Sequence, residues 1–162
     1  MNWEALILGI CLALITWQDA KFRQVHISLL IIMFLVSFYN SYLQLGNLSI
    51  KISGFNILFF FLTFGLMVAY ISIKNNSFNN PFTHYFGLGD VLFYVAVSPL
   101  FVNRYYVLFF ICSLLFSMLL HAVFKKVSKH NTVPLAGYAA FLLLLIISCD
   151  VLTDSKITTI FL

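Results

Sequence analysis

The sequence has few charged residues for its length. Only 9% of its 162 residues are charged, and only five are acidic. Soluble domains carry about a quarter of their residues as charged side chains, so an ordinary soluble domain is excluded. With so few acids, each one needs its own explanation. They are Glu4, Asp19, Asp90, Asp150 and Asp154.

Cysteine and proline are also scarce, at three residues each. Cys11, Cys112 and Cys149 each lie inside an apolar run, without Cys-x-x-Cys spacing and without a nearby pair of histidines. That pattern argues against a zinc site or a disulfide framework and favours packing residues. No proline-rich or Gly/Ser-rich linker divides the chain. We therefore expect one transmembrane domain over residues 1–162, with no metal and no cofactor.

Hydrophobic residues make up 62% of the sequence, and aromatic residues 18%. A helix needs about 20 residues to cross a hydrocarbon core of about 30 Å. The apolar runs predict an all-α integral membrane bundle of about six transmembrane helices. These runs are Trp3–Trp17, Ile27–Leu45, Ile52–Ile73, Val91–Val102, Tyr105–Phe124 and Pro134–Leu152.

The net charge of +4 predicts an orientation in the membrane and not a nucleic-acid partner. If both termini are extracytoplasmic, six basic residues lie on the cytoplasmic side of the membrane and three on the other side. The positive-inside rule favours this orientation. The cytoplasmic six are Lys21, Arg23, Lys74, Lys125, Lys126 and Lys129, and the other three are Lys51, Arg104 and Lys156. We therefore expect a multi-pass protein of the inner (cytoplasmic) membrane, with the lipid bilayer as a partner.

The longest polar stretch begins at Lys74 and is rich in asparagine. Asparagine side chains compete with the hydrogen bonds of a helical backbone, so Lys74–Asn80 is predicted to be a mobile loop. The sequence leaves open whether this loop closes over a site.

Two of the acids lie at matched depth. Asp90 is 13 residues from Asn103, about 20 Å along a helix, and Asp19 is 15 residues from Glu4, about 22 Å. Each carboxylate therefore stops roughly 8–10 Å short of the cytoplasmic boundary. A carboxylate so close to hydrocarbon costs roughly 2.5–3.5 kcal/mol, which calls for a function.

Two neighbouring carboxylates can share one proton. The ionised acid can take a proton from a water molecule that attacks a peptide carbonyl, while the protonated acid donates to the carbonyl oxygen. Gly87 and Gly89 suit such a site, because glycine allows a positive φ or the close approach of another chain. We therefore expect room for an extended substrate beside Asp90, which lies near the N-terminus of its helix.

Each of these residues also has a simpler interpretation. Asp19 could be an interfacial residue that ends a helix beside Lys21 and Arg23, and Gly87–Asp90 could be a helix N-cap after a glycine turn. Together the two acids could form a proton or cation relay. His26 and His84 lie near the acids in sequence, where interfacial solvation competes with a tuning role or contact with a substrate leader.

The ordered set of motifs resembles the type IV prepilin peptidases and their preflagellin relatives, the GxGD membrane aspartic peptidases. Those enzymes use an Asp after the first helix and the Asp of a GxGD motif. Asp19 and the Gly87-Leu88-Gly89-Asp90 sequence match these positions, and Arg23 matches the basic residue of the family. The family's late Pro-aromatic-small stretch resembles Val133-Pro134-Leu-Ala-Gly137-Tyr138.

The resemblance implies an aspartic endopeptidase that removes the basic leader of pilin-like precursor proteins at the cytoplasmic face. Its catalytic residues would be Asp19 and Asp90, with Arg23 in support. The chain departs from the family at Val25-His26-Ile27, where Ile-Pro-Asn is usual, and at Leu92, where lysine is common. It also lacks the cysteine-bearing insert of the bifunctional members, so we expect cleavage without methylation.

Two other functions remain open from the sequence. A presenilin-like protease would cut within the helices of other membrane proteins, but there the first Asp usually lies inside a longer helix, whereas Asp19 is predicted to end one. The other possibility is a membrane protein without enzymatic activity, either a small ion- or proton-coupled protein or a catalytically inactive relative of the peptidases with a binding role.

Overall fold

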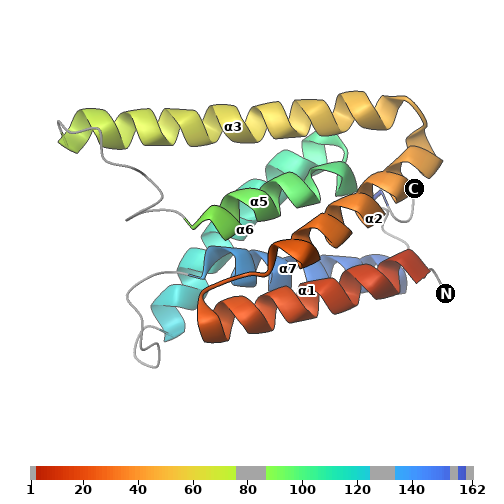
Figure 1. The fold of residues 1–162 in the computed structure, drawn as a ribbon, viewed down its shortest axis with the longest axis horizontal. Coiled ribbons are helices and arrows are strands. Elements are labelled where there is room, and N and C mark those ends of the chain that lie inside the picture. The colour runs from red at the N-terminus through yellow and green to blue at the C-terminus, as the bar shows by residue number, and fades with distance from the viewer. Residues whose placement is uncertain (1–2, 76–86, 125–133, 154–156, 160–162) are drawn as a thin grey trace.

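The computed structural model describes residues 3–75, 87–124, 134–153 and 157–159, and this part of the chain is helical without strands (Figure 1). The elements are α1 (Trp3–Phe22), α2 (Ile27–Leu45), α3 (Leu48–Asn75), α5 (Leu88–Val97), the 3-10 turn η1 (Ser98–Leu100), α6 (Asn103–Phe124) and α7 (Leu135–Thr153). The expected all-α class is therefore confirmed.

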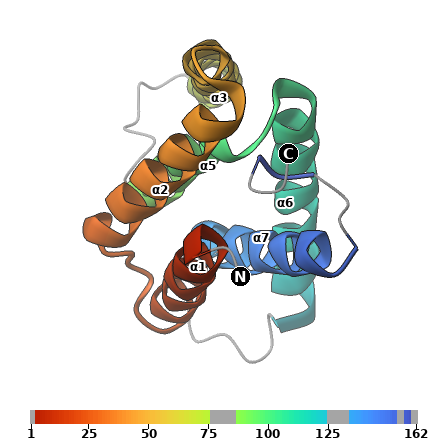
Figure 2. The same ribbon diagram turned by 90° about the vertical axis from the view of Figure 1, so that its right-hand side faces the viewer.

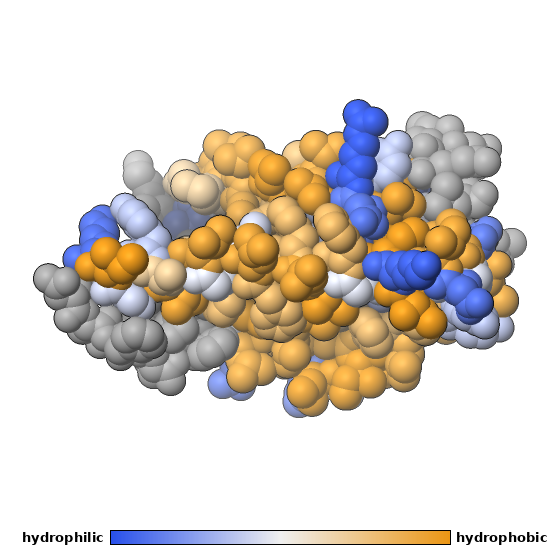
Figure 3. Space-filling view, turned by 90° about the horizontal axis from the view of Figure 1, so that it is seen from above, coloured by the Kyte–Doolittle hydropathy of each residue, from blue (hydrophilic) through white to orange (hydrophobic). Residues whose placement is uncertain are grey.

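Five of these helices are long and apolar enough to cross a membrane: α1, α2, α3, α6 and α7. The remaining apolar segment, Leu88–Leu100, is shorter than a full span. Apolar side chains cover most of the face seen in Figure 3, and hydrophilic residues gather toward its two ends. Several apolar helices thus indicate a multi-pass membrane protein.

Helix boundaries depart from the sequence-based expectation at two places that concern the site. α1 continues through Asp19 to Phe22, so Asp19 does not end the helix. α3 continues through Asn75, so the loop predicted to begin at Lys74 does not begin there. The other residues of that predicted loop, 76–80, lie outside the described part of the chain.

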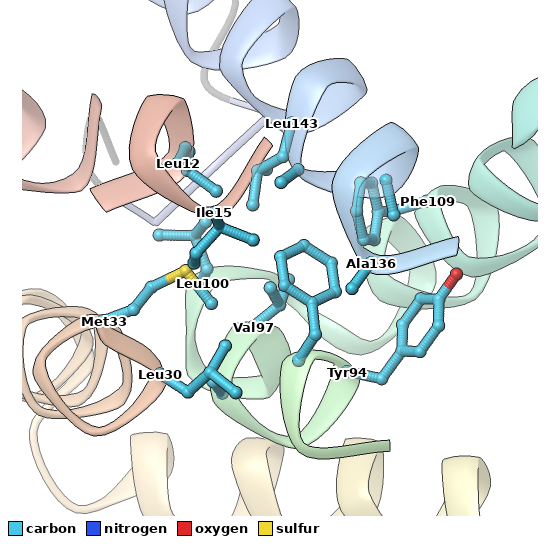
Figure 4. Packing of buried hydrophobic residues seen from close by; sticks show 14 of the residues in the cluster. Leu12, Ile15, Leu30, Met33, Tyr94, Val97, Leu100, Phe109, Ala136 and Leu143 are labelled. Carbon is cyan, nitrogen blue, oxygen red and sulfur yellow. The ribbon is translucent and has the colours of Figure 1, made fainter. Parts of the chain in front are cut away.

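The core lies where α1, α2, α5 and α7 meet, and large apolar side chains from all four helices point toward one another (Figure 4). α1 packs along α7, and α2 packs against both α1 and α5 (Figure 2). Leu12, Leu30, Val97 and Leu143 are among the buried residues that join them. Close packing of this kind holds helices together in lipid, where the hydrophobic effect between helices is weak.

α3 has a different relation to this core. Its buried residues end at Phe60, and large apolar side chains beyond it are exposed, among them Leu62, Leu66, Tyr70 and Ile73. Figures 1 and 2 show α3 at the edge of the bundle. The second half of α3 therefore presents an apolar surface of the kind that faces lipid.

α5 stops early because Pro99 lies in the turn that follows it. Proline cannot continue the helical hydrogen bonds, and each freed backbone carbonyl needs another donor. The Asn56 side-chain amide donates to the carbonyls of Ser98 (2.8 Å) and Phe101 (2.9 Å), and the Thr159 backbone amide donates to that of Leu100 (2.8 Å). Side chain and tail together therefore cap the end of the short helix.

The cysteines divide between the core and the outer surface. Cys11 is buried on α1, as a packing residue should be, but Cys112 and Cys149 are exposed on α6 and α7. The expectation of packing residues is therefore wrong for these two. In a bilayer, an apolar thiol on the outer face of a helix is compatible with lipid.

Candidate active site

Asp19 and Asp90 meet at the N-terminus of α7. The Gly137 amide donates a hydrogen bond to Oδ2 of Asp19 (2.6 Å), and the Ala136 amide donates to Oδ1 of Asp90 (2.7 Å). Because these amides belong to consecutive residues, the two carboxylates lie side by side. Hydrogen bonds from backbone amides to a carboxylate are strong, and the helix dipole adds positive potential at this end.

The carboxylates are close enough for their charges to interact. Asp19 is buried, with 6% of its surface exposed, and Asp90 is partly buried. Repulsion between two carboxylates in such a setting favours a pair that holds one proton. An acid pair of this kind can act as general base and general acid toward a water molecule and a carbonyl group.

The Gly87–Asp90 segment forms the start of α5. Oδ2 of Asp90 also accepts a hydrogen bond from the Gly87 amide (3.1 Å), which caps the first turn of the helix. The simpler interpretation of this motif, an N-cap, is therefore present in the structure together with the contact to α7. Both oxygens of Asp90 accept backbone hydrogen bonds, which fixes the orientation of its carboxylate.

Neither glycine of the motif uses a left-handed backbone. The φ angle of Gly87 is −74°, and Gly46 is the one glycine in the described residues with a positive φ. Of the two possible reasons for glycine at these positions, a positive φ is therefore excluded, which leaves close approach. Gly87 is instead limited by space, because a Cβ atom there would lie 3.2 Å from Oδ2 of Asp90.

Gly89 faces a neighbour within the protein. A Cβ atom on Gly89 would lie 3.7 Å from Cβ of Val25, which is ordinary contact. Val25 belongs to the segment between α1 and α2, so this segment packs against the start of α5. The side of Gly89 that was expected to leave room for a substrate is covered by Val25.

Arg23 lies directly after α1 in a left-handed conformation, with φ of 55°, and its amide donates to the carbonyl of Asp19 (3.1 Å). This is the geometry of a helix C-cap in which glycine is usual. The Arg23 guanidinium also interacts electrostatically with the Asp19 carboxylate. The predicted supporting residue is thus close to one acid of the pair.

Gly137 was not predicted as a site residue. A Cβ atom at this position would lie 2.9 Å from Oδ2 of Asp19, closer than real Cβ contacts, and 3.0 Å from its Cβ, which is tighter than most. The sequence signal was the glycine three residues after Pro134, at the start of the last apolar run. Its spacing reveals the start of a helix, but not which side chain lies against that start.

The histidines contribute little to the described site. His26 is exposed at the start of α2, where its backbone amide donates to Oε1 of Gln18 (3.1 Å). His84 lies outside the described residues. Among the residues that are described, no group of three or more His, Cys, Asp or Glu side chains could hold a metal ion.

No known protein family, curated protein or solved structure matches this chain.

Proposed function

We propose that this chain is a membrane aspartic endopeptidase of the prepilin peptidase type, which removes the basic leader of pilin-like precursors. The observation that carries the proposal is the meeting of Asp19 and Asp90 at consecutive amides of α7. Two acids that are far apart in the sequence would not converge in this way if each were only a helix-end residue. The reaction needs a water molecule and no covalent intermediate.

The proposed mechanism begins with a water molecule bound between the carboxylates. The ionised acid takes a proton from this water as its oxygen attacks the scissile carbonyl carbon, and the protonated acid donates to the carbonyl oxygen. Collapse of the tetrahedral intermediate breaks the C–N bond, and the departing nitrogen receives a proton from the acid that had acted as base. One hydroxyl proton of the intermediate returns to the other acid, so the pair again holds one proton. The α7 amides hold the carboxylates in place throughout.

The orientation belongs to the same proposal. Basic residues gather at the end of the bundle where Asp19 lies: Lys21 and Lys74 in the last turns of α1 and α3, and Arg23 directly after α1. By the positive-inside rule, this supports a cytoplasmic site. Nζ of Lys21 lies 5.0 Å from the ring centroid of Trp17 and 5.1 Å from that of Phe22, an aromatic and basic cluster typical of a headgroup interface. Because Asp19 lies between Trp17 and Lys21, the site would lie close to this interface.

The test is co-expression of the protein with a panel of pilin-like precursors, with leader removal read from the precursor's size. We expect Asp19→Asn and Asp90→Asn each to abolish cleavage. Asp154→Asn, which changes an acid outside the pair, is the matched control and should cleave like the wild type. Cleavage that survives both site substitutions would exclude the two-acid mechanism.

A presenilin-like protease is the second candidate, and one observation favours it. Asp19 lies inside α1, which continues to Phe22, and so resembles the first Asp of such proteases more than expected. A panel that also includes single-span membrane proteins without a pilin-like leader distinguishes the two. Cleavage within their membrane spans, with the pilin-like precursors left intact, would favour this candidate.

A further inference from the structure

α2 packs against both α1 and α5, the helices that carry Asp19 and Asp90, but the two carboxylates themselves are held by a third helix, α7. α7 packs along α1 and also contacts α5, and its first turn makes the hydrogen bonds to both carboxylates. The relative position of Asp19 and Asp90 therefore depends on how closely α7 approaches α1. At the site the approach is close, because the Gly137 amide is 2.6 Å from Oδ2 of Asp19.

We propose that Gly137 is a positioning residue of the acid pair, because its missing side chain leaves the space that the Asp19 carboxylate occupies. This inference rests on the proposed function for its catalytic meaning, but the contact itself can be measured without a substrate. A methyl group at this position would overlap Oδ2 of Asp19 at 2.9 Å and press on its Cβ at 3.0 Å. Either Asp19 must turn away or α7 must move from α1.

Rotation of the Asp19 side chain cannot resolve the overlap by itself. The carboxylate oxygen is the movable end of the side chain, but Cβ is attached directly to the α1 backbone, 3.0 Å from the added methyl group. Relief therefore requires a shift between the two helices, which also moves the Ala136 amide that holds Asp90. A shift of a few tenths of an ångström relieves such a contact. Because a misplacement on the order of 1 Å in a catalytic group costs about 100-fold in rate, this smaller shift should cost about threefold to tenfold.

The chain offers a spectroscopic test that needs no substrate. The protein has seven glycines, and two of them donate their amides to the pair: Gly137 to Asp19 and Gly87 to Asp90. Labelling glycine with ¹⁵N in detergent micelles therefore gives a simple spectrum with one reporter for each carboxylate. We expect Asp19→Asn to shift the Gly137 resonance strongly, and Asp90→Asn to shift that of Gly87.

The positioning role is tested with Gly137→Ala, and Gly9→Ala is the matched control. Gly9 also lies in a helix, but an added Cβ there meets nothing within 4 Å. We expect Gly137→Ala to shift the Gly87 resonance and to lower kcat about threefold to tenfold with KM nearly unchanged. Gly9→Ala should leave the Gly87 resonance and both constants as in the wild type.

The outcomes separate this inference from the proposed function. If Asp19→Asn leaves the Gly137 resonance in place in folded protein, the contact is wrong, whatever the cleavage results. If Gly137→Ala folds and keeps the wild-type Gly87 resonance and kcat, the positioning role is overturned. If the resonances shift as expected while no precursor is cleaved, the contact holds and the proposed function fails.

Discussion

Thr158 donates two hydrogen bonds to the side chain of Asp150. Its backbone amide and its hydroxyl both donate to Oδ2 of Asp150 at 2.8 Å, and the Ile157 amide donates to Oδ1 (3.2 Å). Asp150 is fully buried. This acid therefore has a structural role, and it holds the segment that caps the end of η1.

We expect Asp150→Ala to destabilise the protein, because the Ile157 amide, the Thr158 amide and the Thr158 hydroxyl lose their buried acceptor. The cost should be about 1–3 kcal/mol, measured as a fall in the thermal unfolding temperature in detergent. Thr158→Val removes the hydroxyl but keeps the backbone hydrogen bond, so it should cost about 1 kcal/mol. An Asp150→Ala protein as stable as the wild type would show that the tail is held by something else.

Asn56 should be equally sensitive, because its amide group is the donor to two carbonyls freed by the break at Pro99. We expect Asn56→Leu to cost about 1–3 kcal/mol in unfolding free energy. Ser72→Ala is the control in the same helix, since the Ser72 hydroxyl bonds only to the Val68 carbonyl of its own helix. Equal unfolding temperatures for the two variants would contradict the capping role.

The left-handed backbone at Arg23 predicts that glycine at this position is more stable than alanine. A non-glycine residue pays roughly 1 kcal/mol for this conformation. We therefore expect Arg23→Gly to be more stable than Arg23→Ala by about 1 kcal/mol in thermal unfolding. The two variants should lose leader cleavage equally, because both remove the positive charge beside Asp19, while Arg23→Lys should retain part of the activity. Full cleavage by Arg23→Ala would rule out a supporting role for the charge.

The two glycines of the Gly87–Asp90 motif should respond differently to alanine. A Cβ at Gly89 makes ordinary contact with Val25, whereas one at Gly87 presses on the Asp90 carboxylate. We expect Gly87→Ala to lower the rate of leader cleavage about tenfold or more and Gly89→Ala to lower it little. Kinetics on one precursor compare them directly, and a larger loss for Gly89→Ala would restore the idea that this glycine makes room for substrate.

The sequence predicted the elements that depend on local patterns. The run Ile27–Leu45 matches α2 residue for residue, because its apolar stretch ends at a glycine turn. The end of α1 was misplaced, since the polar residues after Trp17 look like a helix boundary. The helix continues because Asp19 points inward and finds a donor in α7, a contact that no local pattern can reveal.

The acid pair itself was accessible from the sequence, because acids in apolar surroundings are rare and costly. What holds the pair was not, because the donors are backbone amides of Ala136 and Gly137. Every residue except proline has such a group, so residue type does not mark it. Similarly, Gly89 was expected to leave open space, but it packs against Val25, a neighbour visible only in three dimensions.

The contact between α7 and the two acids also has a consequence for biosynthesis. The ribosome makes α1 and α5 before α7, and chains fold as they emerge. While the nascent chain is being inserted, Asp19 and Asp90 are already in the membrane, but the amides that align them do not yet exist. The proposed protease would therefore acquire its aligned acid pair only after α7 has been made, and it would be inert toward neighbouring nascent chains until then.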